Sequence, residues 1–172
     1  MYIFPDRPAP EQEPEWIERS LRIGDCFDVL LHNKFEYCPQ VFKTLKQYGI
    51  TLEDDVYILV QFDSGVLWTA DQILLDRSVS LIDRIFAIWG RVFRMHLFTS
   101  DGFLYGLLCF SEPFQGERFT WQVQSCCDRL MSWMEHQDLR ILVSRDEAGE
   151  QGIFHAANSL RYGVDYLRFF DE

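Results

Sequence analysis

The sequence predicts an α+β protein whose core has the element order βαββαβ, preceded by two helices and closed by a further helix. Three observations lead to this prediction. One run of apolar residues is typical of a buried strand, an Asp-Gly pair lies between two strand-like runs, and apolar residues recur at helical spacing around them.

The N-terminal part predicts an arm followed by two helices. Residues 1–14 contain four prolines and few residues that can be buried, which indicates a flexible arm. From Glu15 onward, apolar residues follow a helical spacing at Trp16, Ile23, Phe27 and Leu30. A second helix is expected from Pro39 to Tyr48, because proline favours a helix start and Gly49 a helix end. Residues 15–50 are thus a helical lead-in.

The first strand and the helix after it come next. Residues 56–62 are almost all β-branched, aromatic or aliphatic, so they predict a central strand buried on both faces, ended by Asp63-Ser64-Gly65. Between Asp71 and Trp89 the apolar stripe is unusually wide, which is typical of a core helix or of a subunit interface. The interface alternative has these candidate residues: Trp68, Leu75, Ile82, Phe86 and Trp89.

The remaining elements complete the pattern. Residues 92–98 and 103–110 flank an Asp-Gly turn and predict a hairpin. We expect a helix from Glu117 to His136, a strand over 139–144, a charged loop from Arg145 to Gln151, and a last helix with the core stripe Ile153, Ala156, Leu160, Val164 and Leu167. This order is that of the ferredoxin-like split βαβ, with antiparallel pairing at its hairpin and helices on one face. Residues 15–172 form one domain, with the α+β core over 51–172.

Composition excludes several classes of protein. The chain has 172 residues, 16% of them aromatic, which argues against disorder. Its 27 acidic and 16 basic side chains give a net charge of −11, spread along the chain. Nucleic acids and anionic membranes both require a positive surface, so direct contact with either is not expected.

The cysteines and the N-terminus indicate a cytoplasmic protein. The five cysteines are an odd number without Cys-x-x-Cys spacing, which fits neither a disulfide framework nor a zinc site, so we interpret them as reduced core residues. No basic leader precedes an apolar run, and no apolar stretch approaches the length of a membrane span.

A search for catalytic motifs yields one weak candidate, a divalent metal site. Asp63 ends the first strand and Asp101 lies in the hairpin turn, and a βαββαβ sheet brings these two places near each other. Two carboxylates there would bind magnesium and orient the phosphates of a nucleotide. The alternative is that Asp63 caps its own turn and Asp101 belongs to an ordinary hairpin. His96, in mid-strand, has no partner at motif spacing and is interpreted as structural.

Several segments together resemble a known family. They are residues 57–63, the hairpin 99–103, and Ile141 to Ser144 followed by residues 152–170. This arrangement is similar to a degenerate GGDEF-like domain of the kind found in the N-terminal parts of bacterial AraC-type transcription regulators. In that family the last helix carries small residues, an acidic residue and an aromatic residue. The resemblance places the small residues at Ala156 and Gly163, the acidic residue at Asp165 and the aromatic residue at Tyr166.

The resemblance implies a domain without catalysis and without a cofactor. The cyclase signature Gly-Gly-Asp-Glu-Phe falls on residues 99–103, where only Asp101 and Phe103 match it. In such regulators a helix-turn-helix region follows the domain, so the resemblance implies that DNA is bound by a separate domain beyond residue 172.

We therefore expect a non-catalytic regulatory domain of a bacterial transcription regulator, acting by sensing a small-molecule effector or by forming a homodimer. Two alternatives remain. One is a metal-dependent nucleotide-binding enzyme of the cyclase class that uses Asp63 and Asp101, and the other is a stand-alone protein-interaction module.

Overall fold

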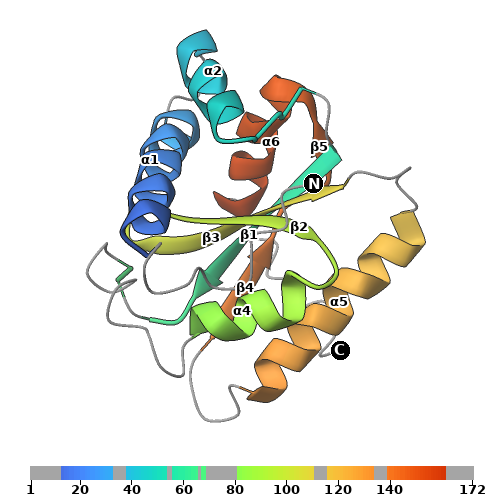
Figure 1. Ribbon diagram of the computed structural model, residues 1–172. Helices are drawn as coiled ribbons and strands as arrows, with labels where there is room; N and C mark the ends of the chain where they lie inside the picture. The colour runs from blue at the N-terminus through green and yellow to red at the C-terminus, as the bar shows by residue number, and fades with distance from the viewer. Residues whose placement is uncertain are drawn as a thin grey trace.

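A five-stranded antiparallel sheet forms the centre of the protein (Figure 1). The computed structural model describes residues 13–32, 38–53, 56–65, 67–68, 81–110, 116–133 and 139–161, with the backbone alone at 13–20 and 116–117. In this part of the chain the elements are α1 (Glu13–His32), α2 (Pro39–Gln47), β1 (Val56–Asp63), α4 (Leu81–Trp89), β2 (Arg94–Ser100), β3 (Phe103–Phe110), α5 (Gly116–Trp133), β4 (Arg140–Val143), β5 (Glu147–Ala148) and α6 (Gly149–Arg161). The predicted α+β class is confirmed.

The strand order is β2-β3-β1-β4. The short β5 pairs with Val56 and Tyr57 at the start of β1, while β4 pairs with the later residues of the same strand. Every pair is antiparallel. Between β4 and β5 the ladder is interrupted at Ser144, whose backbone N–H donates to the Leu59 carbonyl (2.8 Å) while its hydroxyl accepts from the Leu59 N–H (2.9 Å). A side chain thus satisfies a backbone donor that the break in the ladder would leave unpaired.

The predicted hairpin is confirmed. Asp101 and Gly102 both have positive φ, 52° and 77°, as a type I′ turn requires. Strand β2 begins at Arg94 rather than at the expected residue 92, because the end of α4 continues into a turn in which the Phe93 N–H donates to the Trp89 carbonyl (2.9 Å).

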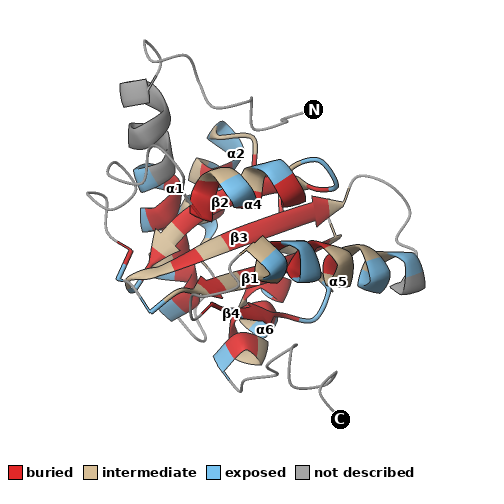
Figure 2. Ribbon diagram, turned by 90° about the horizontal axis from the view of Figure 1, so that it is seen from below, coloured by how far each residue is buried: buried red, intermediate tan, exposed pale blue. Residues whose placement is uncertain are grey.

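Helices cover both faces of the sheet, and each face has its own core (Figures 1 and 2). Helices α4 and α5, which come between strands in the sequence, pack on the face that carries Ile58, Val60 and Phe62. Helices α1, α2 and α6 pack on the face that carries Tyr57 and Leu59. Strand β1 is therefore buried on both sides, as its composition predicts.

The apolar face of α4 lies in the first of these cores. Ile82 and Trp89 are buried, Phe86 packs against the same cluster, and Trp68 joins it from the loop after β1. The Trp89 ring meets Phe62 edge to face, with 5.6 Å between ring centroids. These are contacts of a core helix. Leu75 and the rest of the segment before residue 81 lie outside the described residues.

Several boundaries differ from those expected. Helix α1 begins at Glu13, before the expected Glu15, because a proline such as Pro14 is tolerated in the first helical turn. The segment expected as a charged loop, 145–151, contains β5 and the first turn of α6. Residues 1–12 of the predicted arm 1–14 lie outside the described residues, as does the end of the last predicted helix, with Val164 and Leu167.

The cysteines are core residues with one exception. Cys26, Cys109, Cys126 and Cys127 are buried and Cys38 is half-buried, and none of the five forms a disulfide. Burial raises the pKa of Cys126 to about 11 and that of Cys127 to about 12, so neither thiol is a thiolate near neutral pH.

Candidate functional site

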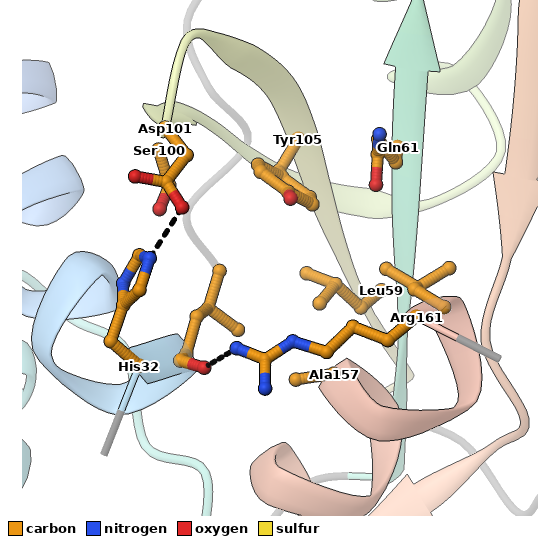
Figure 3. Close-up of a pocket in the computed structure, with 10 residues that line it drawn as sticks. His32, Leu59, Gln61, Ser100, Asp101, Tyr105, Ala157 and Arg161 are labelled. Carbon is orange, nitrogen blue, oxygen red and sulfur yellow. Dashed lines mark hydrogen bonds and ion pairs between the residues drawn. The ribbon is translucent and has the colours of Figure 1, made fainter. Parts of the chain in front are cut away.

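A cavity of about 80 Å³ lies between the C-terminal ends of α1 and α6 and the hairpin end of the sheet (Figure 3). Six of its ten lining residues are polar. The lining residues are Leu31, His32, Leu59, Gln61, Ser100, Asp101, Tyr105, Ala157, Leu160 and Arg161.

The alternation of the strands places the sheet residues of the cavity. Leu59 and Gln61 are two apart on β1, so both point to the α1 and α6 face. In the register of the sheet Gln61 lies opposite Tyr105 of β3. Ser100, at the end of β2, closes this side of the cavity.

His32, in the last turn of α1, connects this helix to the hairpin. Its Nδ1–H donates to the Asp28 carbonyl (2.6 Å) and its Nε2–H donates to an oxygen of Asp101. Since neither acceptor can supply a proton, both ring nitrogens must carry one, and the imidazolium is favoured. The Asp28 carbonyl and then the Asp101 carboxylate accordingly raise the pKa of His32.

Arg161, in the last turn of α6, spans the opposite wall. Its guanidinium donates to the Leu31 carbonyl, near the C-terminal end of α1, where helix carbonyls lack intrahelical donors. The Tyr105 hydroxyl lies across the cavity from it (Figure 3). Burial raises the pKa of Tyr105 to about 12, with a further increase from Asp101 that Arg161 opposes. Tyr105 is therefore a neutral hydroxyl at physiological pH.

Ser100 has an unsatisfied hydrogen-bonding group. The residue is 3% exposed, and its hydroxyl has no hydrogen-bond partner among the residues that the structure describes. An unpaired buried hydroxyl costs about 1–3 kcal/mol relative to a paired one. Because Ser100 lines the cavity, a molecule inside it can supply the missing partner.

The two predicted metal carboxylates lie at the same end of neighbouring strands, but each has a different local partner. Asp63 accepts from the Gly65 N–H (3.1 Å), which is the turn-capping alternative. Asp101 pairs with His32. Across the described ranges there is no group of three or more His, Cys, Asp or Glu side chains suited to hold a metal ion.

Sequence reasoning does not identify most of this site. Asp101 is the one candidate from the sequence that lines the cavity; His32, Ser100, Tyr105 and Arg161 lie far from one another in the chain and belong to no motif. The signal available was indirect, namely a basic residue in the last turn of both α1 and α6. His96 is fully buried on β2, as expected for a structural histidine.

Comparison with known proteins gives no match: no family model, no curated protein and no solved structure is similar to the chain. Among the helices of the described ranges, none is both long enough and apolar enough to cross a lipid bilayer.

Proposed function

We propose that the chain is a non-catalytic regulatory domain that senses a small effector in the cavity between α1, α6 and the hairpin. The observation that carries this proposal is the cavity itself, since it joins three separate elements and contains a buried hydroxyl without a partner in the described structure.

The walls of the cavity provide a route from binding to a response. His32 links α1 to the hairpin, and Arg161 links α6 to α1, so the positions of both helix ends depend on side chains that line the cavity. An effector that prefers one arrangement of these ends shifts the population toward it by its differential affinity.

We further propose that the domain belongs to a bacterial transcription regulator whose DNA-binding helix-turn-helix part lies outside these 172 residues. This part of the proposal rests on the resemblance to GGDEF-like regulatory domains of the AraC type. The strand order β2-β3-β1-β4, with α4 and α5 on one face, supports the ferredoxin-like core that the resemblance implies. Homodimerisation and a cytoplasmic location stay predictions.

A thermal-stability screen tests the sensing function. The 172-residue chain is heated with small molecules grouped by chemistry: carboxylates, amines, sugars, and nucleotides with and without Mg²⁺. A ligand that binds the folded state raises Tm, by mass action. We expect at least one group of molecules to raise Tm of the unmodified chain. The same group should not raise Tm of the Ser100→Val variant, because valine narrows the cavity. If every group leaves Tm unchanged, the sensing function is wrong.

The enzyme alternative has one observation in its favour. Asp63 ends β1, and Asp101 lies at the same end of the sheet, in the turn that leads into the adjacent β3. It predicts that GTP or ATP with Mg²⁺ stabilises the chain and is converted to product, and that Asp63→Asn abolishes both effects. We expect neither stabilisation nor turnover, since both carboxylates are engaged by other groups.

A further inference from the structure

We infer that the cavity binds a short-chain monocarboxylate, with the carboxylate on Arg161 and the short apolar part against Leu59 and Leu160. This inference rests on the proposed sensing function and specifies the class of effector.

The charges of the cavity wall favour one negative charge on the ligand. His32 and Asp101 form an ion pair, so their charges cancel. Among the lining residues that the structure describes, the guanidinium of Arg161 is left as the unbalanced cation. Asp28 is not in the wall, yet its charge acts on both His32 and Tyr105. This nearby acid disfavours a ligand with several negative charges, such as a phosphate dianion.

The hydrogen-bonding groups favour an oxygen acceptor on the ligand. Arg161 has five N–H donors in a planar fork and gives one to the Leu31 carbonyl. Its fork matches the two oxygens of a carboxylate. The hydroxyls of Tyr105 and Ser100 and the amide of Gln61 add donors around the same space (Figure 3). The buried Ser100 hydroxyl would gain the partner that it lacks in the described structure.

The size of the cavity limits the ligand. One water molecule requires roughly 10–15 Å³ by the same measure, so a cavity of about 80 Å³ holds on the order of five to eight such groups. Acetate, propionate and lactate are of this size. Pockets for nucleotides and other large ligands are roughly 300–1,000 Å³, several times this volume. Leu31, Leu59, Ala157 and Leu160 supply the apolar part of the wall.

Titration calorimetry of the 172-residue chain with propionate tests the inference, with two matched probes. Propionamide has the same shape without the charge, and propylammonium has the opposite charge. Inorganic phosphate distinguishes a carboxylate from another oxoanion. We expect binding of propionate and at least about tenfold weaker binding of the other three, because a charged partner strengthens hydrogen bonds.

Variants locate the binding. Arg161→Gln should weaken propionate binding about tenfold or more, Arg161→Lys should weaken it less, because the charge stays and the fork is lost, and Ser100→Ala should weaken it several-fold. Arg118→Gln is the matched control, since Arg118 is an exposed arginine on α5 across the sheet. Circular dichroism shows whether Arg161→Gln is folded. If it is not, the single variants Arg161→Lys and Ser100→Ala test the carboxylate inference in its place.

The outcomes separate the two proposals. Equal binding of propionamide and propionate, preferred binding of phosphate or propylammonium, or affinity that is unchanged in Arg161→Lys and Ser100→Ala overturns the carboxylate inference. If another chemical class binds in a manner that depends on Ser100, the inference is wrong and the sensing function stands. If no class binds, both are wrong.

Discussion

His32 and Asp101 form an ion pair that joins the last turn of α1 to the β2–β3 turn, across 69 positions of sequence. The two side chains are 47% and 65% exposed, so water screens the pair and its contribution to stability is small. It nevertheless fixes one wall of the cavity.

The His32 pair predicts a pH-dependent stability. The folded-state pKa of His32 is raised, so its contribution is complete below the unfolded-state value near 6.5 and is lost as the pH rises through the folded-state pKa. Urea unfolding across this window should show the free energy of unfolding falling as the pH rises. His32→Gln should lose the His32 part of this dependence, and Asp101→Asn should reduce it. The same slope in His32→Gln as in the unmodified chain contradicts the prediction.

Ser144→Ala should destabilise the protein by about 1–3 kcal/mol, because it removes the acceptor of the buried Leu59 N–H. Denaturant unfolding measures the change. Ser132→Ala is the control, since the Ser132 hydroxyl donates to the Asp128 carbonyl on the exposed side of α5 (2.8 Å) and its loss should change stability by no more than about 0.5 kcal/mol. Equal effects of the two substitutions would show that the ladder does not depend on Ser144.

Gly152→Ala should destabilise the protein by about 1–3 kcal/mol, although alanine is the better helix former. A Cβ at Gly152 would lie 2.8 Å from the Tyr57 hydroxyl and 2.9 Å from Cβ of Glu147, so α6 would have to move away from β1 and β5. Thermal unfolding gives the change, and Gln151→Ala, at the exposed neighbouring position, serves as control. A higher Tm for Gly152→Ala would disprove this close packing.

Trp89→Ala should cost about 3–5 kcal/mol of stability, as expected for removal of a large side chain from a core. The matched control is Trp121→Ala on α5, because Trp121 is 70% exposed. Denaturant unfolding and sedimentation, measured together, distinguish a core residue from a dimer anchor. A Trp89→Ala chain of unchanged stability that dissociates from a dimer would assign Trp89 to an interface instead.

The sequence predicts the elements of this fold better than it predicts the site. Strand β1 and the hairpin are found because their signals are local: a continuous apolar run and an Asp-Gly pair. The two-residue β5 has no such signal, since Glu147 and Ala148 are ordinary loop residues whose pairing depends on β1. The cavity depends on how the helices pack against the strands. No spacing along the chain predicts the hydrogen bond from the Arg161 guanidinium to the Leu31 carbonyl.

The two-sided burial of β1 has a consequence for folding. In a sheet with one solvent-exposed face, a register shift of one residue turns a row of apolar side chains toward water. The free-energy cost of this exposure favours the correct register. A slip of β1 would instead exchange two apolar rows between two apolar cores, so polarity gives little protection. Specific contacts must then select the pairing. Gly106 leaves room beside the Phe62 ring, where an added Cβ would lie 3.3 Å away. Ser144 forms hydrogen bonds with both the N–H and the carbonyl of Leu59. Misregistered chains are therefore the expected off-pathway species during refolding, and changes at Gly106 or Ser144 should increase their yield.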